Sequence, residues 1–314
     1  MLSRRSLLAG LGTTTVFATT TVTIGKTKAF IPLIAKSNAH SFWRAVRDGA
    51  MQSGVDQGAD VTFKSPTNEG QIRVQAELLA AIFSQNPSAV GLAALDELTL
   101  IPLLRDFEAA GIPIIAFDSG VQSDIPVTTC ATDNLAAAAR AADEMAALVN
   151  GTGKIAIISH DAASQTGIDR VAGFKERAAK THPGLEIVAT QYGGGDHLIS
   201  EQITLSILKA YPDLQAIFAA NEGTVIGVLN AIEKHTSKVS IIGYDSGQQQ
   251  RAAVRSGLVA GAISQNPYRI GYETVAAAIR AIQKQDLPKR IDTGFAYYTA
   301  SNMDSPEISA MLYD

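Results

Sequence analysis

The chain has 314 residues, of which 46% are hydrophobic and 18% charged. A chain of this length holds roughly two domains, and its composition excludes disordered, collagen-like and coiled-coil proteins. With 26 basic against 30 acidic residues the formal net charge is −4, so we expect no nucleic-acid partner. The single cysteine, Cys130, permits neither an intrachain disulfide nor a cysteine metal cluster.

The first residues have the pattern of an export signal. Arg4 and Arg5 precede an uncharged run at residues 6–25, which corresponds to the cationic start and apolar middle of a signal peptide. Small residues at Val16 and Ala18 make a cleavage site. Residues 1–18 are therefore predicted to be a signal peptide, and the mature protein is expected in the periplasm.

Two alternatives for this segment stay open. The paired arginines favour the twin-arginine export route, but Leu7 and Leu8 stand where that route favours a Phe, so the general secretory route is the alternative. The uncharged run could also anchor the chain, because about 20 residues can span a bilayer. Its many threonines argue against an anchor.

From about Phe30 onward, short β-branched runs alternate with alanine-rich stretches of helical period. The helical stripe is clear in residues 72–83, where Ile72, Ala76, Leu79 and Phe83 fall on one face. Such alternation predicts an α/β fold with parallel sheets. The strands are expected at residues 30–35, 61–63, 89–93, 112–117, 155–158, 216–219 and 239–244.

The chain also repeats itself. Residues 111–120, GIPIIAFDSG, match residues 238–247, KVSIIGYDSG, and Pro87 upstream corresponds to Pro212. The matched positions stay 125 to 127 residues apart, which indicates an internal duplication. We therefore predict two similar doubly wound lobes joined by a hinge. The first comprises residues 30–132 plus 265–292, and the second residues 133–264 plus 293–314.

Asp118 and Asp245 follow equivalent strands of the two repeats. In open parallel sheets a ligand binds beyond the carboxyl ends of the strands, and clefts between domains are favoured pocket sites. The two aspartates are therefore expected to face one cleft. The alternative is that each only caps the turn that follows, because Asp-Ser-Gly is a good turn sequence.

The sequence contains no motif for catalysis, a metal or a cofactor. A Gly-x-Ser-x-Gly elbow, a His-Glu-x-x-His pair and a Cys-x-x-Cys pair are all missing. Gly193, Gly194 and Gly195 lack the spacing of a dinucleotide fingerprint and are interpreted as a flexible loop. Four histidines beside turn residues are interpreted as solvated surface: His160, His182, His197 and His235.

Several motifs in this order resemble the type I periplasmic sugar-binding proteins, over residues 30–294. They are Ser41-Phe42-Trp43 with Asp48-Gly49-Ala50, Ile115 to Asp118, Thr132-Asp133-Asn134, Arg170 with Gly173-Phe174, Phe218 to Glu222, Gly243-Tyr244-Asp245 and Ile263-Ser264-Gln265. The resemblance implies that Phe42 and Trp43 stack on a sugar ring. It also implies hydrogen bonds to the sugar from Asp118, Arg170, Asn221, Asp245 and Gln265.

Three departures from the ribose-binding members bear on the ligand. Ser119 stands where those proteins have an Arg, His40 replaces an Asn, and a Phe of the second lobe falls near Gly195. We therefore expect His40 and Ser119 to line a pocket for a ligand other than ribose. A pentose, a hexose or a sugar alcohol is expected.

The resemblance implies a solute-binding protein that closes over its ligand and delivers it to an ABC permease in the inner membrane. The hinge would lie near residues 132–133, 264–265 and 292–293. We expect a monomer with no cofactor and no metal. The alternatives are an exported sugar-modifying enzyme, in which Asp118 and Asp245 would act as the paired carboxylates, and a ligand-sensing protein that feeds a chemoreceptor.

Overall fold

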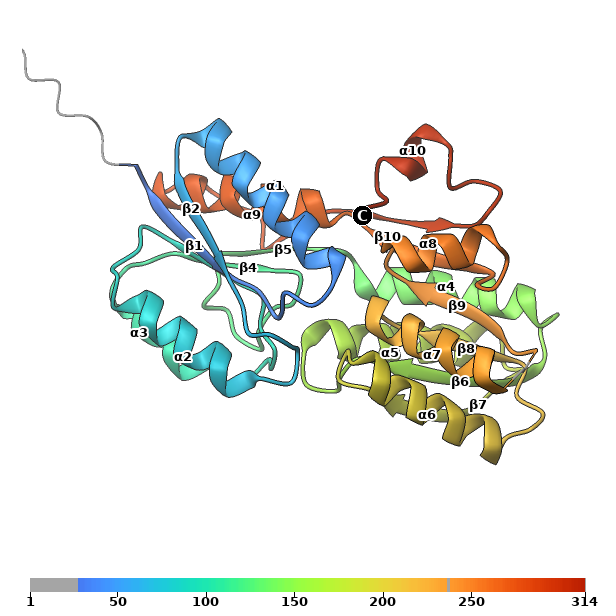
Figure 1. Ribbon diagram of the computed structural model, residues 1–314. Helices are drawn as coiled ribbons and strands as arrows, with labels where there is room; N and C mark the ends of the chain where they lie inside the picture. Colours follow the sequence, from blue (N-terminus) through green and yellow to red (C-terminus); the bar gives the residue numbers. More distant parts are fainter. Residues whose placement is uncertain (1–27, 236–237, 314) are drawn as a thin grey trace, which may run out of the picture.

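The computed structural model describes residues 28–235 and 238–313, so the predicted signal peptide and the alternative anchor lie outside the described residues. The described chain forms two α/β lobes, each built on a six-stranded sheet (Figure 1). Among the described helices, none combines the length and apolar character that crossing a bilayer requires.

In the first lobe all neighbouring strands are parallel, in the order β11-β5-β4-β3-β1-β2. Helices α1 and α9 pack together on one face, and α2 and α3 cover the other. The strands are β1 (Phe30–Ile34), β2 (Asp60–Lys64), β3 (Val90–Leu92), β4 (Ile114–Phe117), β5 (Thr128–Ala131) and β11 (Arg290–Asp292). The helices are α1 (Ser41–Gln57), α2 (Ile72–Phe83), α3 (Ile101–Ala109) and α9 (Pro267–Ile282).

The second lobe has the order β12-β10-β9-β8-β6-β7, with only β12 antiparallel to its neighbour. Helices α4 and α5 pack on one face, and α6 and α7 on the other. The strands are β6 (Gly153–Ser159), β7 (Leu185–Tyr192), β8 (Ala216–Ala219), β9 (Ser240–Tyr244), β10 (Gly261–Gln265) and β12 (Phe295–Tyr298). The helices are α4 (Asn134–Leu148), α5 (Gln165–Thr181), α6 (His197–Ala210), α7 (Glu222–His235), α8 (Gln248–Arg255) and α10 (Pro306–Ser309).

Each sheet separates two hydrophobic cores because successive strand side chains point to opposite faces. In β1, Leu33 packs in the core beneath α1 and α9, whereas Ile34 packs in the core beneath α2 and α3. The strand order β2-β1-β3-β4-β5 of the first lobe recurs as β7-β6-β8-β9-β10 in the second. The prediction of two similar doubly wound lobes is confirmed.

The chain passes between the lobes three times. The connections are residues 132–133 from β5 to α4, residue 266 from β10 to α9, and residues 293–294 from β11 to β12. Because α9 packs on β3, β4 and β5, this late helix belongs to the first lobe.

All of the expected strands are present, with ends within two residues of those predicted, and the expected helix at residues 72–83 is α2. The duplication therefore places Asp118 and Asp245 directly after β4 and β9, at the same edge of each sheet.

Candidate functional site

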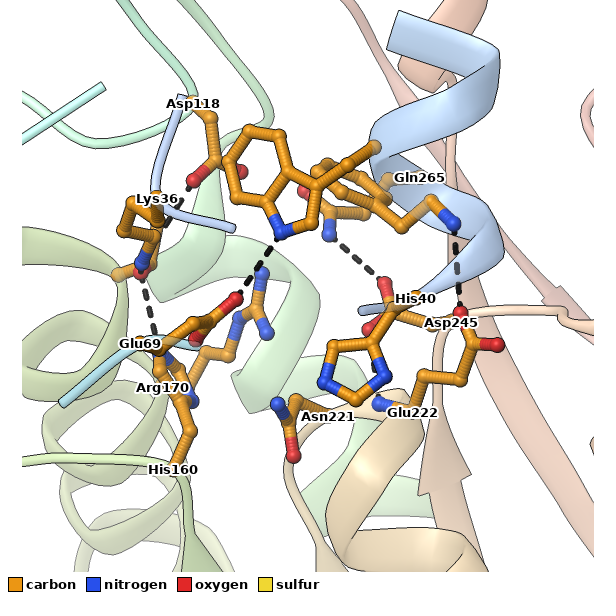
Figure 2. Close-up of a pocket in the computed structure, with 13 residues that line it drawn as sticks. Lys36, His40, Glu69, Asp118, His160, Arg170, Asn221, Glu222, Asp245 and Gln265 are labelled. Carbon is orange, nitrogen blue, oxygen red and sulfur yellow. Dashed lines mark hydrogen bonds and ion pairs between the residues drawn. The ribbon is translucent and has the colours of Figure 1, made fainter. Parts of the chain in front are cut away.

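A cavity lies between the lobes at the carboxyl ends of the strands (Figure 2). Both lobes contribute to its lining, and Figure 2 shows the side chains converging on it. The lining residues are Lys36, His40, Phe42, Trp43, Glu69, Asp118, His160, Thr166, Arg170, Asn221, Glu222, Asp245 and Gln265.

Asp118 and Asp245 have matching backbone geometry. Both lie in the left-handed region, with φ of 57° and 81°, which Asp tolerates better than most residues. The Asp118 N–H donates to Cys130 O at 2.9 Å, and the Asp245 N–H donates to Ile263 O at 2.6 Å. Each aspartate is thus held by the strand next to its own, and the structure brings both carboxyl groups to one cavity.

The surroundings of Asp118 raise the pKa of its carboxyl above the ordinary value. Burial raises the pKa of its carboxyl to about 6, because the charged form is poorly solvated there. The Lys36 ammonium, 3.7 Å from Asp118 Oδ2, and the Arg170 guanidinium oppose this rise, whereas Glu69 and Asp245 add to it. Lys36 also donates to Thr166 Oγ1 at 2.9 Å in the second lobe.

Asp245 is organised by two hydrogen bonds. Its Oδ2 accepts from the Glu222 backbone N–H at 3.0 Å, and its Oδ1 accepts from Gln265 Nε2 at 2.8 Å. Gln265 is 1% exposed, and its Oε1 is buried with no partner among the described residues. A buried acceptor without a donor is costly, so this oxygen indicates that a donor belongs in the cavity.

Arg170 is fixed on three sides. Its Nε donates to Asn134 Oδ1 at 2.8 Å, and its Nη1 donates to Ala220 O at 2.8 Å. The guanidinium lies over the Tyr244 ring, 3.8 Å from the centroid, and the Tyr244 hydroxyl donates to the same Asn134 oxygen at 2.8 Å. The planar donor group therefore faces the cavity in a single orientation.

Phe42 and Trp43 form the apolar wall of the cavity. They lie in the first turn of α1, are 5% and 3% exposed, and meet edge to face with ring centroids 4.9 Å apart. Both also belong to the core of the first lobe. Trp43 Nε1 donates to Glu69 Oε1 at 3.0 Å, so the indole is fixed by a cavity-lining carboxylate.

His40 and Asn221 lie where the lobes meet. His40 Nε2 is 3.1 Å from Gly195 O, which is in the second lobe. Asn221 Oδ1 accepts from the Thr224 N–H at 2.9 Å and so caps α7. Ser119 is buried but does not line the cavity, and its hydroxyl accepts from the Thr166 N–H at 3.4 Å.

Residues 31–286 match the family model of the periplasmic binding protein domain. The chain belongs to this family. It is 30% identical over 229 residues to the ribose import binding protein of Haemophilus influenzae, a match that covers 68% of this chain and 78% of the relative. The resemblance predicted from the motifs is confirmed.

Solved structures of periplasmic binding proteins superpose closely on this one. A solute-binding protein of Agrobacterium vitis with bound D-fucose has a TM-score of 0.87 at 32% identity, and covers 91% of this chain and 100% of its own. A carbohydrate-transporter protein of Agrobacterium radiobacter with D-arabinose has a TM-score of 0.87 at 29% identity, and covers 91% and 99%. These relatives are binding proteins of transport systems, not enzymes.

The interpretation of His160 as solvated surface is wrong. This histidine is 1% exposed and lines the cavity, with its Nε2 3.1 Å from Thr166 Oγ1. Burial lowers the pKa of His160 to about 4. His182 is half-buried at the surface, with its Nε2 2.6 Å from Asp143 Oδ1. His197 and His235 are exposed as expected.

The cavity of this periplasmic binding protein contains five further polar residues that sequence reasoning missed: Lys36, Glu69, His160, Thr166 and Glu222. Lys36 and His160 come just after β1 and β6, at the strand ends where ligands bind. Both could therefore have been predicted as site residues from their positions after the predicted strands. Glu69 comes from a loop before α2, and nothing in the local sequence marks it.

Glu69, His160 and Asp161 place possible ligand atoms within 4.8 Å of one another. Burial alone would raise the pKa of the Glu69 carboxyl, but the charge of Lys36, with His160, lowers it below its ordinary value. An ammonium group thus already supplies the positive charge in this cluster, which disfavours a metal cation there.

Proposed function

We propose that this protein is the sugar-binding component of an ABC importer. It binds a monosaccharide, or a sugar alcohol, in the cavity between its lobes in the periplasm, and delivers it as a monomer to a permease of the inner membrane. The observation that carries this proposal is the combination of an aromatic wall with buried hydrogen-bonding groups from both lobes around one small cavity. The relatives that bind D-fucose and D-arabinose support it.

The chemistry of the lining suits a sugar. A sugar ring has apolar C–H faces and hydroxyls around its edge, so Phe42 and Trp43 can cover a face while polar groups take the edge. A carboxylate such as Asp118 or Asp245 accepts from two hydroxyls, and Arg170 donates through its planar fork. Hydrogen bonds to charged groups contribute about 1.5 to 3 kcal/mol each.

The side chains that bind the ligand come from both lobes, so ligand binding is coupled to closure of the lobes. Asp118 is on the first lobe, whereas Arg170, Asn221 and Asp245 are on the second. A ligand that bonds to both sides stabilises the closed arrangement more than an open one, so it shifts the population toward closure. The three connections between the sheets are the positions where a hinge movement would occur, and the closed form is the species that the permease would receive.

Isothermal titration calorimetry of the mature chain tests this function. The panel contains D-ribose, D-allose, D-arabinose, D-fucose, D-galactose, ribitol and galactitol. We expect saturable binding of at least one member, one ligand per chain, and its loss in Asp245→Asn. A folded protein that binds no member would contradict the proposal, and recovery of a chemically altered sugar would favour the enzyme alternative.

A further inference from the structure

Two neighbouring residues after α10 pack into different lobes. Leu312 packs against the core of the second lobe beneath α6 and α7, whereas Tyr313 belongs to the core of the first lobe beneath α1 and α9. The Tyr313 side chain is 8% exposed, and its ring meets Phe42 edge to face with centroids 6.0 Å apart. Tyr313 does not line the cavity, so it supports this part of the apolar wall from outside.

The hydroxyl of Tyr313 is attached to the second lobe. It accepts from the Ser246 N–H at 3.2 Å, and the Tyr313 N–H donates to Ser246 Oγ at 3.3 Å. Ser246 is fully buried and directly follows Asp245. The other end of the peptide group between them is also held, because Asp245 O accepts from Gln250 Nε2 at 2.7 Å and from the Tyr298 hydroxyl at 2.9 Å. Tyr313 thus supplies the acceptor for the amide of the turn that presents Asp245.

The first repeat closes the equivalent turn without such a residue. There Ser119, which corresponds to Ser246, donates its N–H to Phe117 O of the strand just before it, at 2.5 Å. In the second repeat the acceptor comes from Tyr313, 67 residues further along the chain. Because a buried N–H requires an acceptor, the turn that carries Asp245 depends on a distant side chain.

We propose that Tyr313 is a positioning residue of the sugar site, which holds Phe42 of the first lobe and Asp245 of the second at the spacing that a bound sugar requires. This inference rests on the proposed function. One rigid side chain serves both, since its ring packs on Phe42 and its hydroxyl bonds beside Asp245. These partners lie on different lobes, so a hinge movement that separates the lobes breaks one of the two contacts. Tyr313 therefore favours the closed arrangement without contacting the sugar.

Isothermal titration calorimetry of two variants separates the two contacts. The probes are the sugars and sugar alcohols of the titration panel, from D-ribose to galactitol, and affinity is compared for the one that the wild type binds most tightly. Tyr313→Phe keeps the ring but leaves the Ser246 N–H without its acceptor, so affinity falls about fivefold. Tyr313→Leu loses the aromatic pair as well, so affinity falls about twentyfold.

Phe107→Leu is the matched control. Phe107 is fully buried in the other core of the first lobe, where its ring meets Phe83 edge to face with centroids 4.9 Å apart. The substitution breaks an aromatic pair of the same kind, but neither ring lines the cavity. Both leucine variants lower the free energy of unfolding in urea, whereas Phe107→Leu keeps the sugar affinity within about twofold of the wild type.

The calorimetric measurement distinguishes positioning from a general loss of stability. Unfolded protein in a sample lowers the number of binding sites per chain and leaves the affinity of the folded molecules unchanged. Circular dichroism establishes that each variant is folded. The partial recovery of affinity in Tyr313→Phe, relative to Tyr313→Leu, measures the contribution of the ring alone.

Two results would overturn the positioning role. One is wild-type affinity in folded Tyr313→Phe and Tyr313→Leu, and the other is an equal loss of affinity in Tyr313→Leu and Phe107→Leu. A folded wild-type chain that binds no member of the panel would overturn the proposed function and the positioning role with it, whereas sugar binding that does not respond to either change at Tyr313 would overturn the positioning role alone.

Discussion

Glu222 of the second lobe caps the helix that begins at Ser41 in the first lobe. Glu222 Oε1 accepts from the Ser41 hydroxyl at 2.7 Å, and Oε2 is 3.4 Å from the Phe42 N–H. The residue that precedes α1, His40, makes no capping hydrogen bond with its own side chain. Free N–H groups at a helix start attract a negative charge, so the acceptor that α1 lacks in its own lobe is supplied across the cavity.

Replacement of Glu222 by Gln should weaken closure. The variant keeps an oxygen for Ser41 but loses the charge at the start of α1, a change of about 1 kcal/mol. We expect sugar affinity to fall about fivefold in calorimetry, and the ligand-free protein to be more open in small-angle X-ray scattering. The control is Glu307→Gln, which removes the same charge from the exposed first turn of α10. If Glu222→Gln and Glu307→Gln change sugar affinity equally, Glu222 does not act as the cap of α1.

The raised pKa of Asp118 predicts a dependence of stability on pH. Its folded pKa of about 6 exceeds the ordinary value of 3.8, so between these values the folded state binds more protons than the unfolded one. The stabilisation is therefore present at low pH and is lost as the pH rises through about 6, by about 3 kcal/mol in total.

Urea unfolding of the wild-type protein and Asp118→Asn at pH 4, 5, 6 and 7 measures this effect, because asparagine does not titrate. The free energy of unfolding of the wild type, relative to the variant, should decrease across this range. If the difference in the free energy of unfolding between the wild type and Asp118→Asn stays constant from pH 4 to 7, Asp118 is ionised throughout this range.

The sequence predicts those strands that are continuous runs of buried apolar residues. The central strands β1, β4, β8 and β9 are runs of apolar residues and were located from the sequence alone. The strand β5 has the sequence TTCA, and β11 has only three residues, RID, of which none is buried. Such segments become strands because a neighbour pairs with them, and that pairing is decided by tertiary structure.

The sequence predicts those site residues that occupy matched positions in the two repeats. Asp118 and Asp245 follow matched strands, so their common position could be inferred without coordinates. Glu69 reaches the cavity only because α1 places the Trp43 indole beside it, a contact between segments with no shared pattern. Long-range contacts of this kind are not encoded in local spacing, so this carboxylate could not have been inferred.

Arg170 should be essential for ligand binding as an arginine and not merely as a cation. In Arg170→Lys, the ammonium cannot bond to Asn134 and Ala220 while it stacks on Tyr244. We expect sugar affinity to fall about a hundredfold, equivalent to about 3 kcal/mol. The matched control is Arg177→Lys on the same helix, where the partly exposed guanidinium pairs with Asp143. The control should change affinity less than about twofold, and a comparable loss in both variants would contradict the prediction.

Trp43 should report ligand binding directly, because it is the only tryptophan of the chain and its indole lines the cavity. Addition of the sugar identified by calorimetry replaces water near the indole with an apolar ring face, so we expect the tryptophan emission to shift and to saturate with the calorimetric affinity. Trp43→Phe keeps an aromatic face but loses the hydrogen bond to Glu69, so it should bind about tenfold more weakly in calorimetry. This variant contains no tryptophan, so any sugar-dependent tryptophan emission of the wild type comes from Trp43. An unchanged emission spectrum at saturating sugar would mean that the indole does not contact the ligand.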